Sequence, residues 1–341
     1  MVTSTIYRAF SFFQFALQTG EAILVDEART LLRAALSLSK TANAVSLWWI
    51  SRIALNLVDD LWSSSLHETL PKVGPAGAHP YERLRRLFIG ELFAREISEV
   101  ELWPSQIAAA HRSTDLGDDL VVALPTSAGK TRIAEIAALM ALACGQRVLI
   151  VTPLRALSAQ TERSFRRTFS PLGFTISSLY GAGGIAGTDE DALRTHNIVI
   201  ATPEKLDFAL RNDPHIIDDI GLVVLDEGHL IGPTDREIRY ENLVQRLLRR
   251  SDSGSRRMVC LSAILPEGDQ LNDLTAWIRS DAPGEAIQSR WRPTRQRFGT
   301  LAWAVKSAKL NFNLEADAPF IQHFIRQVPA IKPRADGARR G

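Results

Sequence analysis

The sequence of 341 residues is poor in cysteine, with only Cys144 and Cys260. Two isolated cysteines, each inside an apolar run, provide neither the ligands of a zinc site nor a disulfide framework, and we expect both to be buried free thiols. The chain also lacks a run of about 18 apolar residues, which argues against a transmembrane helix. Its first residues have neither a basic start nor a continuous apolar stretch, so no secretory signal is predicted and the expected location is cytoplasmic.

The net charge is small as well, +2 at pH 7, so the overall charge gives no indication of a nucleic-acid partner. Arginine is nevertheless concentrated in two segments, Arg246, Arg249, Arg250, Arg256 and Arg257 in the first and Arg290, Arg292, Arg295 and Arg297 in the second. Each cluster is either a phosphate-binding surface or an ordinary solvated face, and the sequence leaves both interpretations open. The length favours about two domains.

Residues 1 to 70 have the periodicity of amphipathic helices. In the first helical segment the apolar stripe consists of Ile6, Phe10, Phe13 and Leu17. In the segment that begins near residue 45 we expect the buried stripe to consist of Ile50, Ile53, Ala54 and Leu57. A loop rich in proline and glycine follows at 70–80, and a further amphipathic helix begins at residue 81.

From residue 105 onward, short runs rich in valine and isoleucine alternate with helical patterns. The expected strands are 119–124, 147–152, 175–180, 197–201, 221–226 and 257–262. Such alternation predicts an α/β fold, a parallel sheet with helices on both faces, preceded by an all-α region. Ligands of such sheets bind at the carboxyl ends of the strands.

The expected strand at 119–124 leads into PTSAGKT and then into a helical pattern, which is the context of a phosphate-binding loop. Backbone N–H groups of the loop and the start of the helix can hold phosphate oxygens. Gly129 permits close approach of the backbone, Lys130 supplies a positive charge, and the Thr131 hydroxyl can bind Mg²⁺. We therefore predict an ATP·Mg²⁺ site formed by Thr126, Ser127, Ala128, Gly129, Lys130 and Thr131. Leu124 stands where the general pattern has its first glycine.

DEGH, residues 226–229, begins at the last residue of the expected strand 221–226. An acid at a strand end, here Asp226, binds Mg²⁺ in phosphate-loop enzymes, often through water. Glu227 is then placed to orient and deprotonate an attacking water molecule. The alternative is a solvated turn, which the position of DEGH downstream of the phosphate loop makes the weaker interpretation.

Taken in order, these stretches resemble the first RecA-like domain of a superfamily 2 helicase of the DExH/DEAD-box branch, over about 105–297. The resemblance implies that LWPSQ supplies Gln106 to read adenine, that PTSAGKT is motif I, and that DEGH is motif II, with His229 as its last member. Helicases of this superfamily replace the first glycine of the loop, so Leu124 is a small departure. LSAI (261–264) resembles motif III, in which Ser262 would couple hydrolysis to strand binding, although Ile264 stands where the family has threonine.

Three further stretches, TPLRALSAQ (152–160), SLYGAGG (178–184) and TPEKLD (202–207), resemble loops that contact a nucleic-acid strand in this family. The residues implied by the resemblance are Pro153, Arg155, Gly181, Thr202 and Pro203. Loop N–H groups and helix starts suit phosphate oxygens, which position a strand without reading its sequence. The implied partner is therefore DNA or RNA, with no preference between them.

We expect three parts: a helical accessory region (1–98), the RecA-like ATP-binding domain (99–297), and a remainder (298–341). In the remainder, RFGTLAWAVK and LNFNLE can form two extra strands and the tail is expected to be disordered. The family's motor needs a second RecA-like domain, for which too few residues follow 297. A truncated chain, or a second polypeptide that supplies this domain, is the resulting hypothesis.

The most probable function is therefore the ATP-binding half of a nucleic-acid-dependent ATPase or helicase, an NTP hydrolase incomplete as a motor by itself. A non-catalytic nucleotide-binding or regulatory module, which docks a partner through its helical N-terminus, is the alternative. A phosphate-loop NTPase of another class, such as a transporter ATPase, has the least support because no transporter signature is present.

Overall fold

The computed structural model describes residues 2–72, 74, 80–179, 193–263, 269–293, 299–304 and 307–312. The chain divides into two units, Met1–Pro293 and Thr294–Gly341. In the second unit, β8 (Gly299–Ala304) and β9 (Ser307–Phe312) pair antiparallel, with Leu301 opposite Leu310. β8 lies within RFGTLAWAVK, whereas β9 begins three residues before LNFNLE. The expected disordered tail and the arginines at 295 and 297 lie outside the described residues.

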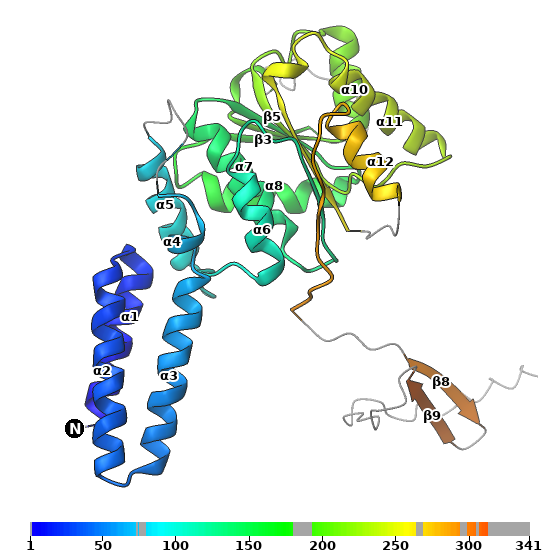
Figure 1. Ribbon diagram of the computed structural model, residues 1–341. Helices are drawn as coiled ribbons and strands as arrows, with labels where there is room; N and C mark the ends of the chain where they lie inside the picture. Colours follow the sequence, from blue (N-terminus) through cyan, green and yellow to red (C-terminus); the bar gives the residue numbers. More distant parts are fainter. Residues whose placement is uncertain are drawn as a thin grey trace, which may run out of the picture. The chain divides into compact units, whose positions relative to one another are not determined.

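The first unit begins with three long helices that lie side by side (Figure 1): α1 (Val2–Thr19), α2 (Ala22–Thr41) and α3 (Val45–Ser63). They share an apolar core to which α1 contributes Ile6, Phe13 and Leu17, while Phe10 is only partly buried. Among the described residues, no helix has the length and hydrophobicity needed to cross a membrane.

The expected buried stripe of α3 is wrong, apart from Ala54. Ile50, Ile53 and Leu57 are exposed, and the buried face consists of Ser51, Ala54, Leu55, Val58 and Trp62. The helix is apolar over most of its circumference, so periodicity did not distinguish the two faces. Together with Val45 and Trp49, the three misplaced residues form an exposed apolar stripe.

Short helix α4 (Leu66–Thr69) and helix α5 (Tyr81–Phe93) connect the bundle to the rest of the unit. Nε2 of the buried His67 in α4 lies 2.9 Å from the Leu17 carbonyl oxygen in α1. After α5, Arg95 donates hydrogen bonds to Glu99 (2.8 Å) and to the Thr168 hydroxyl (2.7 Å), and Glu99 pairs with Arg132. Because Arg132 follows Thr131 directly, this network ties the segment after α5 to the helix that begins at the phosphate loop.

A seven-stranded sheet forms the core of the unit, with strand order β3-β4-β2-β5-β6-β1-β7, and every pair is parallel. The strands are β1 (Leu120–Ala123), β2 (Arg147–Val151), β3 (Ile176–Leu179), β4 (Ile198–Ala201), β5 (Ile220–Leu225), β6 (Arg257–Ser262) and β7 (Ile287–Gln288). The first six lie where the valine- and isoleucine-rich runs predicted strands, while β7 has only two residues and was not predicted. The predicted α/β, RecA-like fold class is therefore confirmed.

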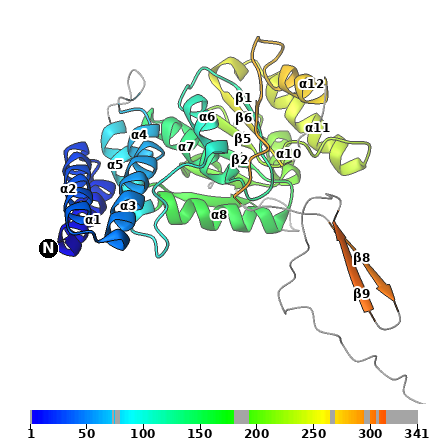
Figure 2. The ribbon, with the colours of Figure 1, turned by 60° about the horizontal axis from the view of Figure 1, so that its bottom comes forward.

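Helices cover both faces of the sheet (Figure 1, Figure 2). One face carries α6 (Pro104–Ser113), α7 (Lys130–Ala143) and α8 (Arg155–Phe169), and the other α10 (Pro203–Asn212), α11 (Asp235–Leu248) and α12 (Asp269–Ile278). Strand residues alternate between these two cores, so that Leu120 and Val122 face one and Val121 and Ala123 the other.

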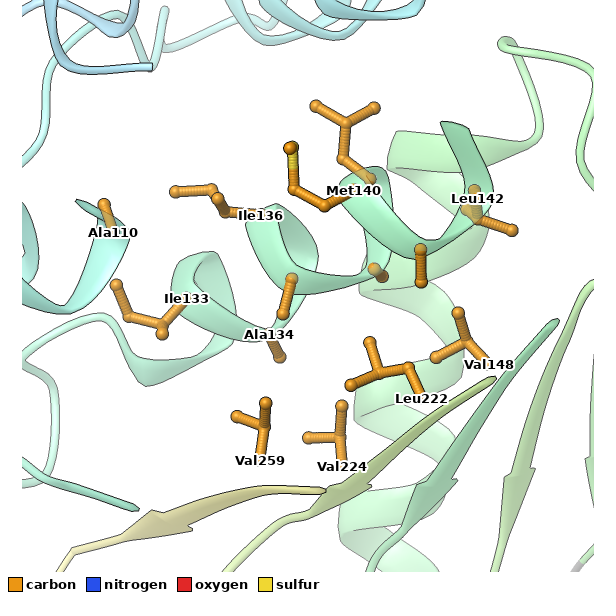
Figure 3. Close-up of a cluster of buried hydrophobic side chains, with 14 of the residues drawn as sticks. Ala110, Ile133, Ala134, Ile136, Met140, Leu142, Val148, Leu222, Val224 and Val259 are labelled. Atoms are coloured by element: carbon orange, nitrogen blue, oxygen red, sulfur yellow. The ribbon is translucent and has the colours of Figure 1, made fainter. Parts of the chain in front are cut away.

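Helix α7 is the most deeply buried of these helices, with all residues from Ile133 to Ala143 buried. Figure 3 shows its side chains between the sheet and Ala110 of α6, above Val148, Leu222, Val224 and Val259. Five of its residues are alanines, which lets the helix lie close to its neighbours on all sides. Since α7 begins at Lys130, this packing fixes the position of the phosphate loop.

Candidate nucleotide and nucleic-acid site

The phosphate loop lies between β1 and α7, at the carboxyl edge of the sheet. Ser127 and Gly129 both have positive φ, 68° and 81°. Left-handed residues alternating with right-handed ones turn successive N–H groups inward and form an anion-binding nest. Lys130 and Thr131 are the first residues of the helix that follows, so its free N–H groups and dipole point to the same place.

Leu124 is fully buried in the core shared by α6, α7 and the sheet. Its N–H donates to the Ser262 carbonyl at the end of β6, at 3.0 Å. The side chain therefore anchors the start of the loop from below and stays away from the concave side. This placement explains why the loop geometry tolerates leucine where the general pattern has glycine.

Gln106, predicted to read adenine, is buried in α6 and contacts the phosphate loop itself. Its Nε2 donates to the Gly129 carbonyl at 3.0 Å, and its Oε1 accepts from the Trp103 N–H at 2.7 Å. A methyl group on Gly129 would lie 2.0 Å from Nε2 of Gln106. Gln106 therefore holds the loop in place through both ends of its amide.

Trp103 also contacts the segment that follows β7. Its ring lies 5.6 Å from that of Trp291, centroid to centroid, with a tilt of 47°. Trp291 opens the arginine-rich stretch WRPTRQR, and Arg292 follows it. The pair thus places the start of this segment beside the residue that precedes α6.

DEGH follows β5, and the structure brings it next to the phosphate loop. Nζ of Lys130 lies 3.9 Å from Oε1 of Glu227, and Nδ1 of His229 lies 3.5 Å from Oε2 of the same carboxylate. The Asp226 N–H donates to the Val151 carbonyl at 2.9 Å. Glu227 has a left-handed backbone, with φ 50°. Lys130, Asp226, Glu227 and His229 therefore belong to one cluster.

Burial dominates the electrostatics of this cluster. It raises the pKa of Asp226 to about 6, with a further contribution from the Glu227 carboxylate. Burial also lowers the pKa of Lys130, against the attraction of Glu227 and Asp226, and lowers the pKa of His229. The Asp226 carboxylate is therefore unfavourable in its charged form at this buried position, and a bound cation would stabilise that form.

Two buried atoms of the cluster, Oε2 of Glu227 and Nδ1 of His229, have no hydrogen-bond partner among the described residues. Their separation allows electrostatic attraction but does not meet hydrogen-bond geometry. No group of three or more His, Cys, Asp or Glu side chains among the described residues forms a metal cage. A Mg²⁺ held by Thr131, one carboxylate, phosphate oxygens and water needs no such cage, so the residues present fit this ion.

The residues predicted to contact a nucleic-acid strand lie at the ends of neighbouring β-strands. Pro153 and Arg155 follow β2, Thr202 and Pro203 follow β4, and the Thr152 N–H donates to the Ala201 carbonyl at 3.0 Å. Arg155 is exposed at the start of α8, whereas Thr202 and Pro203 are buried. Gly181 lies outside the described residues.

Arg236 of α11 links the loop after β2 to the loop after β4. The sequence did not predict a role for this residue. Its guanidinium donates to the Pro153 carbonyl and, through Nε, to Oε1 of Glu204 at 3.0 Å. Pro153 belongs to the loop after β2, and Glu204 to the first turn of α10. Arg236 stands in the polar stretch TDRE, where nothing in the sequence indicates such a contact.

Ser262, predicted to couple hydrolysis to strand binding, is fully buried at the end of β6. Its carbonyl accepts the Leu124 N–H, so motif III meets motif I through the backbone. Ile264 lies outside the described residues. Of the two cysteines, Cys260 in β6 is fully buried, with a pKa raised to about 12 by burial, and Cys144 is only partly buried.

Two arginines of the first cluster, Arg256 and Arg257, belong neither to a phosphate-binding surface nor to a solvated face. Arg256 and Arg257 are buried. Arg256 donates to the Ile217 and Ile220 carbonyls, and Arg257 to carbonyls of 112, 113 and 118. Both lie at the amino end of β6, opposite the phosphate loop, and hold that edge of the sheet together.

A family model described as DEAD/DEAH box helicase matches residues 103–272. The chain is 28% identical over 319 residues to the Hachiman protein HamB of Bacillus cereus, covering 93% of this chain and 28% of that protein. It is 34% identical over 206 residues to the ATP-dependent DNA helicase Hel308 of Pyrococcus abyssi, covering 60% of this chain and 27% of that protein. For Hel308 of Thermococcus kodakarensis the identity is 33% over 221 residues, covering 64% and 18%. The chain spans less than a third of each of these relatives.

Proposed function

Since residues 103–272 belong to the first RecA-like domain of a superfamily 2 helicase of the DEAD/DEAH-box type, we propose that this chain binds ATP·Mg²⁺ and forms the ATP-hydrolysing half of a DNA-dependent motor. The observation that carries the proposal is the approach of Lys130 to Glu227, 3.9 Å apart, at the end of a nested phosphate loop. A lysine–carboxylate pair so placed suits the binding of a phosphate chain and the activation of a water molecule.

In this proposal each residue has one task. The nest from Thr126 to Thr131 holds the phosphate chain, and Lys130 balances the charge of the β- and γ-phosphates. Thr131 and Asp226 would hold Mg²⁺, which supplies charge neutralisation at the phosphates when bound. Glu227 orients the attacking water and accepts its proton, and His229, kept neutral by its burial, lies against the Glu227 carboxylate.

DNA is the proposed strand because the Hel308 relatives are DNA helicases. The loops after β2 and β4, with Pro153, Arg155, Thr202 and Pro203, would contact its phosphates without reading its sequence. We further propose that a second RecA-like domain supplies the arginines that stabilise the transferred phosphoryl group, an effect worth about 10³–10⁵ in rate. Without it, hydrolysis is expected to be very slow and unwinding absent.

Titration of the full chain with a fluorescent ATP analogue, with Mg²⁺ and with EDTA, tests the nucleotide site. Lys130→Ala is expected to weaken Mg²⁺-dependent binding by tenfold or more. Lys72→Ala, which removes an exposed lysine paired with Glu68, is the matched control and should bind as the parent chain does. Equal binding by all three proteins would refute the proposal, and so would strand separation by the chain alone.

A regulatory module that docks a partner is the second candidate. The exposed apolar stripe on α3, with Trp49 and Ile53 at its centre, is the observation that favours it. If docking were the whole function, Lys130→Ala would leave the activity of the parent system unchanged. Loss of that activity would support the motor.

A further inference from the structure

The turn of DEGH lies directly on β6, and its glycine makes the closest approach. The Gly228 N–H donates to the Leu261 carbonyl at 2.9 Å. A methyl group on Gly228 would lie 2.3 Å from Sγ of Cys260. The next nearest atoms, the carbonyl oxygen and Cβ of Leu225, would be 3.6 and 3.7 Å away, at ordinary contact distance. Among the described residues, the thiol is therefore the one group that a methyl group on Gly228 would meet at less than ordinary contact distance.

Cys260 occupies this place because of the register of the sheet. It pairs with Leu225, the last residue of β5, and its side chain belongs to the core on the side of α11. The following residues of β6, Leu261 and Ser262, accept backbone hydrogen bonds from Gly228 and Leu124. One short stretch of β6 thus supports both DEGH and the start of the phosphate loop.

We propose that Cys260 is a positioning residue of the nucleotide site: its side chain fills the space under Gly228 and sets the height of the Asp226–Glu227 turn relative to Lys130. The inference rests on the proposed ATP·Mg²⁺ site. A larger group at either position lifts the turn, because the closely packed interior around β6 leaves no room below. Lifting moves the two carboxylates that face the phosphate loop, while the loop, held by Gln106 and α7, stays in place.

The two positions are therefore coupled by size, which a double-mutant cycle measures. In the full chain, Gly228→Ala is expected to reduce the Mg²⁺-dependent gain in affinity for a fluorescent ATP analogue by tenfold or more. Affinity in EDTA should stay within twofold, because the loop itself is intact. Cys260→Ala alone removes the support beneath the turn and is expected to reduce the Mg²⁺-dependent gain by about threefold, less than Gly228→Ala, because the hydrogen bond from the Gly228 N–H to the Leu261 carbonyl remains. The double variant Gly228→Ala/Cys260→Ala should recover the Mg²⁺-dependent gain, since the new methyl group replaces the lost sulfur.

Two further variants keep the test decisive. Cys260→Val enlarges the side chain from below and is expected to reproduce the loss caused by Gly228→Ala, whatever the folding yield of that variant. Gly221→Ala is the matched control, because its methyl group would also meet a side chain, that of Gln146 at 2.5 Å, but at the amino end of β5, the strand that DEGH follows. It should change the melting temperature without changing Mg²⁺ dependence.

The outcomes separate the two claims. Parent-like Mg²⁺ dependence in Gly228→Ala or Cys260→Val, or a double variant as impaired as Gly228→Ala, overturns the role of Cys260. Absence of Mg²⁺-dependent binding in the parent chain overturns the proposed function. In that case the melting temperatures of the four proteins in the cycle still decide whether Gly228 and Cys260 are coupled.

Discussion

Nε2 of Gln106 donates to the carbonyl of Gly129, 3.0 Å away, so a helix upstream of the sheet holds the residue at which the phosphate loop becomes a helix. The other end of the same amide accepts from the Trp103 backbone. Both polar atoms that a base-reading glutamine would offer therefore have partners in the protein. This arrangement gives Gln106 a role in the shape of the loop.

Gln106→Ala is accordingly expected to weaken binding of ATP and GTP by a similar factor. The loss should be about tenfold, since two hydrogen bonds of roughly 0.5–1.5 kcal/mol each disappear. Parallel titrations with the two nucleotides give the comparison, and Gln160→Ala, at an exposed position of α8, is the control. Loss of ATP binding with GTP binding unchanged would instead assign Gln106 to adenine recognition.

Asp226→Asn is expected to stabilise the nucleotide-free protein at pH 7.5. The pKa of Asp226 is raised from 3.8 to about 6 in the folded state, so the folded state binds the proton more tightly than the unfolded chain. This contribution to stability is complete below about pH 4 and is lost as the pH rises through 6, by up to about 3 kcal/mol. Asp226→Asn carries no charge to bury and so does not lose this stability, and its gain in free energy of unfolding over the parent chain should be smaller at pH 5.

Urea unfolding at pH 5 and 7.5 without divalent ions measures this difference. Asp273→Asn, at an exposed site on α12, provides the control and should show no such pH-dependent gain. Adding Mg²⁺ with nucleotide should stabilise the parent chain more than Asp226→Asn. If Asp226→Asn were less stable than the parent chain at pH 7.5, the burial of the Asp226 carboxylate would not be unfavourable, and this prediction would be wrong.

Arg236→Ala is expected to weaken single-stranded DNA binding about threefold to tenfold while leaving ATP affinity unchanged. The substitution releases the loop after β2 from the first turn of α10, because the guanidinium contacts both Pro153 and Glu204. Fluorescence anisotropy with a labelled oligonucleotide measures the effect. Arg239→Ala removes an exposed arginine from the same helix, and an equal loss there would point to general charge instead of loop position.

Leu55→Ala and Leu57→Ala test which face of α3 is buried. Leu55 is 9% exposed and Leu57 49% exposed, two residues apart on one helix. The first substitution should lower the free energy of unfolding by about 2–5 kcal/mol, and the second by about 0.5 kcal/mol or less. Chemical denaturation of both variants suffices, and the reverse order would restore the stripe predicted from the sequence.

Periodicity and the order of short motifs predicted the sheet because β1, β2, β4, β5 and β6 are buried almost throughout and so read as apolar runs. The edge strand β3 is less buried, with the half-buried Ser177 and Ser178 between Ile176 and Leu179. Strand β7 was not predicted, because its two residues, Ile287 and Gln288, are too few to form an apolar run. In α3 the same method failed for the opposite reason: Ile53 and Leu55 lie on different faces and both are apolar. Which face is buried depends on α1 and α2, and no local pattern carries that information.

The site divides in a similar way. GKT and DEGH were found because their chemistry requires those residue types at strand ends, and the structure places Lys130 beside Glu227 as that chemistry needs. Arg236 and the use of Gln106 depend on contacts between segments distant in the sequence. The buried Arg256 and Arg257 show the same limit, because charge alone suggested an exposed surface.

The order of strands in the sheet also affects how the protein is made. Strand β1 leaves the ribosome before the other strands, yet its two neighbours are β6 and β7, where Leu120 pairs with Val259 and Val122 with Ile287. The phosphate loop, whose first residue bonds to Ser262, cannot close until β6 has been synthesised and inserted between β5 and β1. During that interval β1 remains an unpaired apolar strand to which chaperones can bind, and the proposed nucleotide site is among the last parts of the fold to form.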